Sequence, residues 1–156
     1  MTNHNFGDVA DAVEAAIDPQ ALAYAHGDRI IRWGEAAQRS NRLARAFLNA
    51  ASTGDKVAHY MRNHHAYMET AFASFKARQV HVNINYRYRP AEVAYIIEKS
   101  DAAIVVYGAE FRDVVAEIRD QLPLVKLWVE VADGTPPGGF SPGFETLAPA
   151  RGGSPP

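Results

Sequence analysis

Apolar residues between positions 57 and 131 follow two alternating patterns, short continuous runs and longer segments with helical spacing. The short runs predict strands of a sheet that is covered on both faces, and the periodic segments between them predict helices. An alternation of strand and helix is typical of crossover units in an open parallel sheet, so the fold class is α/β with helices on both faces. The predicted strands are 57–61, 79–84, 102–107 and 124–131, and the predicted helices contain 67–75, begin at Pro90 and cover 109–121.

A helix and a β-hairpin are predicted ahead of this sheet. The helix covers 8–17 and ends before Pro19, since the residue preceding a proline is pushed out of helical geometry. Segments 21–25 and 29–33 then flank Gly27, and glycine readily supplies the positive φ that a tight turn needs. The hairpin therefore precedes the sheet in chain order.

A longer helix is predicted over 34–51, with apolar residues at helical spacing. Arg39, Arg42 and Arg45 fall on its other side. A nucleic-acid interface would require a larger basic patch that also shows in the net charge. We therefore predict that these arginines form a solvated helix face.

Particular residues predict where helices begin and end. Asn63 is the predicted N-cap of the helix that contains 67–75. Pro90 suits the first turn of the next helix, where its missing N–H costs nothing. Pro123 ends the helix over 109–121.

The composition changes after Val131, where proline, glycine and serine become frequent. Such a segment buries little apolar surface to offset the entropy of ordering it. We predict an α/β subdomain over 1–131 and a linker or disordered tail over 132–156, with a short helical turn near 144–147.

Length and composition indicate one soluble globular domain. The chain has 156 residues, of which 47% are hydrophobic and 22% charged. A net charge of -2 gives no indication of nucleic acid as a partner. The absence of cysteine excludes disulfides, thiolate zinc sites and a cysteine nucleophile. Neither a secretory signal nor a transmembrane segment is recognisable, so we expect a cytoplasmic protein.

The loop over 85–89 alternates tyrosine and arginine after a predicted strand. Ligands bind at the carboxyl ends of strands in open α/β sheets, and two guanidiniums between phenols could hold a phosphate or stack on a base. The alternative is a structural loop whose asparagines bond to backbone. We favour the structural interpretation, because no glycine lets a phosphate approach the backbone.

Four histidines lie in or near the predicted strands at His59, His64, His65 and His81. Zinc requires three or four ligands that converge on one point, and no HxxxH or HxH spacing occurs. We expect surface or hydrogen-bonded core histidines and no metal site.

The common catalytic motifs are missing from the sequence. No serine lies in a GxSxG elbow, and neither GxGxxG nor GxxxxGK followed by serine or threonine occurs. ATP chemistry requires backbone donors or cations around the phosphates, and no loop of this chain is suited to that task.

Between residues 21 and 147 the order of several segments resembles the AMP-forming acyl-CoA synthetases, in the N-terminal part only. The resemblance is to members of the fatty-acyl-CoA ligase type and implies the N-terminal subdomain of the adenylate-forming fold. The matching segments are Gly27–Trp33, Glu35 with Ser40–Ala44, Gly54–Ala58, Phe72–Arg78, Val82–Tyr88, Glu92 with Tyr95–Ile97, and Ser100–Ala102.

The resemblance implies a ligase that activates a fatty or related carboxylic acid with ATP and transfers the acyl group to CoA. The parent family uses ATP, Mg and CoA, whereas the family's phosphate loop has no counterpart here. No catalytic, cofactor-binding or metal-binding role therefore transfers to this chain, and we expect it to bind none of these cofactors alone. Asn83, Asn85, Tyr86 and Arg87 match a family loop that we interpret as structural.

Two classes of function follow. The first is a ligase fragment, truncated or completed by a second chain, that is inactive by itself. The alternative is a non-catalytic α/β interaction module or the remnant of a disrupted ligase gene. In either case an uncovered sheet edge is expected to promote homo-oligomers or other association.

Overall fold

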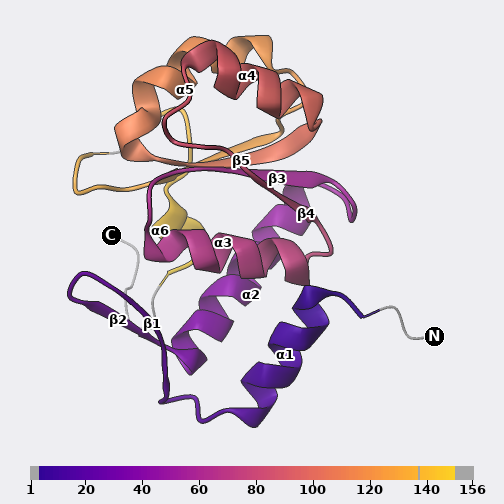
Figure 1. Ribbon diagram of the computed structural model, residues 1–156, viewed down its shortest axis with the longest axis vertical. Coiled ribbons are helices and arrows are strands. Elements are labelled where there is room, and N and C mark those ends of the chain that lie inside the picture. The colour runs from indigo at the N-terminus through magenta and orange to yellow at the C-terminus, as the bar shows by residue number, and fades with distance from the viewer. Residues whose placement is uncertain (1–3, 137, 150–156) are drawn as a thin grey trace.

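A four-stranded parallel sheet forms the centre of the computed structural model, which describes residues 4–136 and 138–149. Helices α4 and α5 cover one face of the sheet, and α2, α3 and α6 cover the other (Figure 1). The expected α/β class is therefore confirmed. The strands, in spatial order, are β4 (Val80–Asn83), β3 (Lys56–Tyr60), β5 (Ala102–Gly108) and β6 (Leu127–Val131).

The chain reverses its direction of travel across the sheet between β3 and β5. It moves from β3 outward to β4, then returns past β3 to add β5 and β6. The two central strands, β3 and β5, therefore flank the topological switch point. The covering helices are α2 (Trp33–Ala50), α3 (His65–Lys76), α4 (Pro90–Lys99), α5 (Arg112–Ile118) and α6 (Phe144–Leu147).

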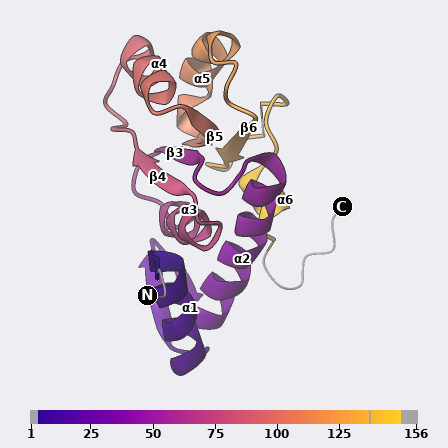
Figure 2. The same ribbon diagram turned by 90° about the vertical axis from the view of Figure 1, so that its right-hand side faces the viewer.

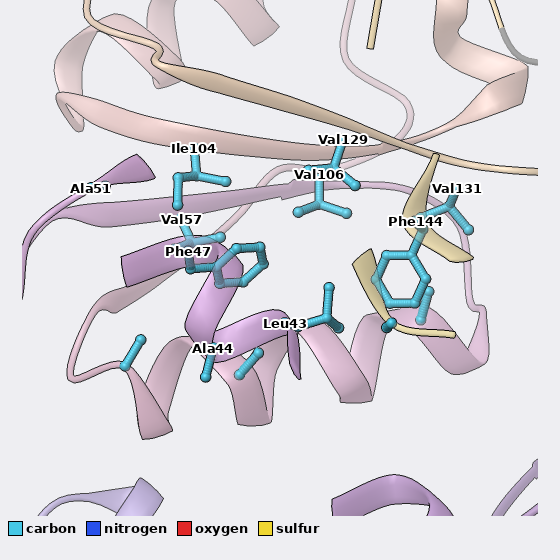
Figure 3. Packing of buried hydrophobic residues seen from close by; sticks show 14 of the residues in the cluster. Leu43, Ala44, Phe47, Ala51, Val57, Ile104, Val106, Val129, Val131 and Phe144 are labelled. Atoms are coloured by element: carbon cyan, nitrogen blue, oxygen red, sulfur yellow. The ribbon is translucent and has the colours of Figure 1, made fainter. Parts of the chain in front are cut away.

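Strand β5 is buried along its whole length, which explains its unbroken apolar sequence. Ile104 and Val106 belong to the core beneath α2 and α3, and Val105 and Tyr107 to the core beneath α4 and α5. Figure 3 shows the first of these cores, where Phe47 of α2 lies against the sheet. Alternate residues of one strand thus supply two separate cores.

The hairpin and the first helix form a layer farther from the sheet. Strands β1 (Leu22–His26) and β2 (Arg29–Arg32) pair antiparallel around Gly27, whose φ is +56°. Helix α1 (Phe6–Ala16) lies on the side of α3 away from the sheet (Figure 2). A Cβ on Gly7 would lie 2.5 Å from the carbonyl oxygen of Phe75, so glycine permits this close approach.

Helix ends match the sequence predictions in part. Pro90 is the first residue of α4, as predicted. The N-cap of α3 is His64 instead of Asn63, because Nδ1 of His64 accepts the N–H of Ala66 at 3.1 Å. The single helix predicted over 109–121 divides into η1 (Ala109–Phe111), α5 and η2 (Arg119–Gln121).

The prediction of a solvated arginine face was wrong for Arg39, whose side chain is 1% exposed. Its Nε donates to Oε2 of Glu69 at 2.9 Å, and Nη2 donates to Oε1 of Glu145 at 2.7 Å. Nη1 also donates to the carbonyl of Ala148 at 2.6 Å. These partners are distant in sequence, so the local pattern of α2 could not reveal them. Arg42 is half-buried and donates to the carbonyl of Pro149, so the prediction was also wrong for it, whereas Arg45 is exposed, as predicted.

Residues 138–149 pack on the domain, which differs from the linker expected there. The predicted helical turn is present as α6, and its Phe144 is 1% exposed within the core beneath the sheet. Gly143 also forms a β-bridge with Glu130 of β6. An aromatic residue, an ion pair and a β-bridge thus together dock a segment rich in proline and glycine. The part of the expected tail over 150–156 lies outside the described residues.

Two of the histidines occupy the space between the sheet and α3. His59 is fully buried, its ring centroid lies 3.9 Å from that of His81, and neither ring nitrogen has a hydrogen-bond partner among the described residues. The expectation of a hydrogen-bonded core histidine was therefore wrong for His59. His81 is half-buried, and its Nε2 lies 3.2 Å from the hydroxyl of Tyr67.

The substitution Arg39→Ala is expected to destabilise the chain by about 3–5 kcal/mol, because it leaves the buried carboxylate of Glu69 without its cation. Urea unfolding followed by circular dichroism measures this free energy. Arg45→Ala, on the exposed face of the same helix, is the matched control and should change stability by about 0.5 kcal/mol or less. Equal effects of the two substitutions would contradict the structural role of Arg39.

The substitution His59→Leu is expected to stabilise the chain by about 1–2 kcal/mol at pH 7, because an unpartnered buried imidazole is replaced by an apolar group. Burial, and then the charge of His81, lower the pKa of His59 well below 6.5. Below that pH the unfolded state binds more protons at this residue than the native state, so wild-type stability falls with pH. The advantage of the variant should therefore widen as pH decreases, and urea titrations between pH 7.5 and 5 measure it. His4→Leu, at an exposed position, is the control; an equal gain there would refute this explanation.

Candidate functional site

A groove of about 280 Å³ lies at the carboxyl ends of β3, β5 and β6. This end of the sheet, next to the switch point, is where open α/β folds bind ligands. Each strand continues into a short segment that forms one wall. The lining residues are Met61, Arg62, Asn63, His64, Gly108, Glu110, Val131, Ala132 and Asp133.

The walls of the groove combine a cation and carboxylates. Arg62 follows β3, and Glu110 and Asp133 follow β5 and β6. A Cβ on Gly108 would lie 2.2 Å from the carboxylate of Glu110, so this glycine leaves room for the carboxylate beside the backbone. Hydrogen bonds from Thr135 lower the pKa of Asp133. The groove therefore presents both charge signs to a polar ligand.

A hydrogen-bonded group around Glu130 fixes the segment that follows β6. Arg112 donates to the two carboxylate oxygens of Glu130 at 3.0 and 2.7 Å, and the hydroxyl of Tyr107 donates at 3.0 Å. Tyr107 also contacts the hydroxyl of Ser141 at 2.8 Å. Burial is the first cause that raises the pKa of Tyr107 to about 12, so it remains a neutral donor. These bonds hold the groove wall after Val131 against the sheet.

The tyrosine–arginine loop lies beside the segment that follows β3. Oδ1 of Asn85 accepts the N–H of Arg87 at 3.0 Å, a local turn of the kind expected for a structural asparagine. The guanidiniums of Arg62 and Arg87 lie over the ring of Tyr86, with Cζ atoms 4.8 and 5.5 Å from its centroid. Asn83 ends β4. Within residues 4–136 and 138–149, neither Arg62 nor Arg87 forms an ion pair.

Sequence reasoning identified the loop but missed Arg62. The two parts are separated by more than twenty residues along the chain, and only the parallel pairing of β3 with β4 brings their ends together. An arginine just after a predicted strand was the signal that could have indicated its position.

The histidines separate into two groups instead of converging. His59 and His81 lie between the sheet and α3, whereas His64 and His65 lie at the start of α3 close to His26. Among the residues that the structure describes, no group of three or more histidine, aspartate or glutamate side chains could hold a metal ion. In the same part of the chain, no helix is both long enough and apolar enough to span a bilayer.

Comparisons with known proteins identify relatives of this chain. The family model for the AMP-binding enzyme matches residues 10–143. The chain is 38% identical over 130 residues to 3-oxocholest-4-en-26-oate--CoA ligase of Rhodococcus rhodochrous, which covers 81% of this chain and 23% of that protein. It is 33% identical over 140 residues to the medium-chain acyl-CoA ligase Mig of Mycobacterium avium, over 80% of this chain and 25% of that protein.

Among solved structures, this chain is also similar to CoA ligases. A fatty acyl CoA synthetase of Mycobacterium tuberculosis matches with a TM-score of 0.74 and 27% identity, over 81% of this chain and 26% of that one. A benzoate CoA ligase of Burkholderia xenovorans shares the fold, with a TM-score of 0.79, 20% identity, and coverage of 95% of this chain and 29% of that one. The chain spans about a quarter of the length of the curated relatives that it matches. The chain therefore belongs to the AMP-binding enzyme family and corresponds to the N-terminal portion of its acyl-CoA ligases.

Proposed function

We propose that this chain is the N-terminal subdomain of an ATP-dependent, AMP-forming acyl-CoA ligase. The complete enzyme would activate a fatty or related carboxylic acid as an acyl-adenylate and transfer the acyl group to CoA. The observation that supports this most is the 38% identity to a CoA ligase over 130 residues, on a sheet of the same fold. The relatives are named as ligases of a 3-oxocholest-4-en-26-oate and of medium-chain acyl groups, which points to an apolar acid.

In that reaction this chain would provide a structural scaffold and one wall of the groove. The sequence has no glycine-rich phosphate loop, so transition-state charge on the phosphates would be stabilised by groups outside it. We therefore propose that the chain alone binds ATP, Mg and CoA too weakly for turnover. Residues 61–64 and 108–110 would form the surface of the groove that faces the remainder of the enzyme.

The tyrosine–arginine loop is proposed to be structural, with one electrostatic contribution. The bond of Asn85 to Arg87 sets the turn, and the guanidiniums of Arg87 and Arg62 both lie over the ring of Tyr86. Two guanidiniums without carboxylate partners in the described part of the chain suit a polyanionic ligand. In the complete enzyme this pair would attract the phosphates of ATP or CoA, without taking part in bond making.

The edge strand β4 is proposed as a site of association in a cytoplasmic protein. Among the strands of the described residues, β4 pairs only with β3, and its Val80 is 49% exposed. An edge strand presents unpaired backbone groups that favour pairing with another chain.

Light scattering after size exclusion should give a mass above that of a 17.1 kDa monomer for the wild-type chain. The substitution Val80→Lys places a charge on the exposed edge and should shift the mass toward the monomer. Leu124→Lys, at an exposed apolar position away from β4, is the control and should leave the mass unchanged. A wild-type mass of one monomer with cooperative melting would refute association through β4.

The proposed activity is tested with the isolated chain and with a chimeric ligase that contains it. The chain alone should give background exchange of pyrophosphate with ATP and fatty acids, because it lacks the phosphate loop. A chimera in which this chain replaces the matched 130 residues of the Rhodococcus rhodochrous ligase should retain thioester formation, within about tenfold of that ligase.

The same chimera with Arg39→Ala is the control for a damaged scaffold and should lose activity, because α6 and α3 lose their shared partner. Robust exchange by the chain alone would refute the proposal that its site is incomplete. A folded chimera without activity would refute the ligase role.

A further inference from the structure

Three histidine rings from two elements meet at the start of α3. The centroid of the His64 ring lies 4.1 Å from that of His65 and 4.9 Å from that of His26, and the latter two centroids are 6.2 Å apart. His26 ends β1, whereas His64 caps α3 and also lines the groove. The cluster therefore joins the hairpin, the helix and one wall of the candidate site.

The hydrogen bond of His64 determines which protonation state the fold requires. Nδ1 of His64 accepts the N–H of Ala66 at 3.1 Å and so carries no proton. A protonated imidazole has donors on both nitrogens and cannot accept this bond. It would also place a positive charge at the positive end of the helix dipole. The cap therefore exists only while His64 is neutral.

The environment of His64 opposes its protonation. Burial, followed by the charges of His65 and His26, lowers its pKa to about 4, and Arg29 acts in the same direction. Glu69 acts in the opposite direction, but its carboxylate is already paired with Arg39 and His65. The charged or titratable groups on the surrounding elements are His65 and Glu69 of α3, His26 of β1, Arg29 of β2, Glu35 and Arg39 of α2, and Arg62, Glu110 and Asp133 along the groove.

We propose that His64 is an acid-sensitive N-cap whose protonation releases the start of α3, the adjoining groove wall over 61–64, and the contact with His26 of the hairpin. The cap is a property of the fold, and the inference depends on the proposed function only for the significance of the groove. Loss of the bond to Ala66 and repulsion from His26 would both loosen the start of α3. The groove is therefore well formed at neutral pH and loosened in acid.

The sign of the effect follows from the difference between the folded and unfolded states. Between pH 6.5 and about 4, the unfolded chain binds a proton at His64 that the folded chain does not. The stability provided by the cap thus decreases through this window as pH falls. An asparagine at the same position accepts an equivalent bond and does not titrate.

Amide hydrogen exchange of the 156-residue chain tests the proposal, with His64→Asn as the main variant. The protection factor of the Ala66 amide, expressed relative to that of Val105 in β5, isolates local opening from global unfolding. From pH 7 to pH 4.5 this ratio should fall about tenfold in the wild type and stay constant in His64→Asn. His64→Ala should show the low ratio at both pH values, and His4→Asn, at an exposed position, should behave as wild type.

Two outcomes would overturn the proposal. The first is a ratio in the wild type that does not change between pH 7 and pH 4.5. The second is a decrease in His64→Asn as large as that in the wild type. Neither measurement involves ligation, so its result is independent of the activity of the chimera.

Discussion

The buried guanidinium of Arg39 is the interaction on which the arrangement of this domain depends. It bonds to Glu69 of α3 and to Glu145 and the Ala148 carbonyl of the α6 segment, while it belongs to α2. Burial by itself would raise the pKa of Glu69, but hydrogen bonds from His65 and Arg39 outweigh burial and lower that pKa. A buried charge requires such partners, so the three helices are positioned together. The Phe144 ring, 5.8 Å from the Arg39 Cζ atom, adds apolar packing at the same point.

The groove is a consequence of the order of strands. Because β3 and β5 are adjacent but belong to crossovers in opposite directions, the segments that leave them diverge and leave space between them. Arg62, Glu110 and Asp133 are held around this space by the ends of three strands. None of them is part of a phosphate-binding loop, which is consistent with a chain that corresponds to about a quarter of its ligase relatives.

Two of the histidines are held in the neutral state by the fold, whereas acidic solvent favours their protonated state. His59 is buried without hydrogen-bond partners in the described residues, and His64 is held neutral by the bond it accepts. Both arrangements favour the uncharged ring, so both make the domain less stable in acid. They act on different regions. Protonation of His59 would affect the core between the sheet and α3, whereas protonation of His64 would affect the start of α3 beside the groove.

The sequence by itself determined the order of strands and helices, the hairpin around Gly27, the start of α4 at Pro90 and the family resemblance. The elements rest on local periodicity, on the fixed φ of Pro90 and on the freedom of Gly27 to take a positive φ, and the resemblance rests on the order of matching segments. Only the tertiary structure decided that Arg39 is buried, that α6 packs against the core, that His64 caps α3, and that Arg62 meets Tyr86. Most of these features join groups that lie far apart along the chain, and the cap depends on the orientation of the His64 ring toward the N–H of Ala66. Tertiary packing determines these contacts, and local patterns of polar and apolar residues do not predict them.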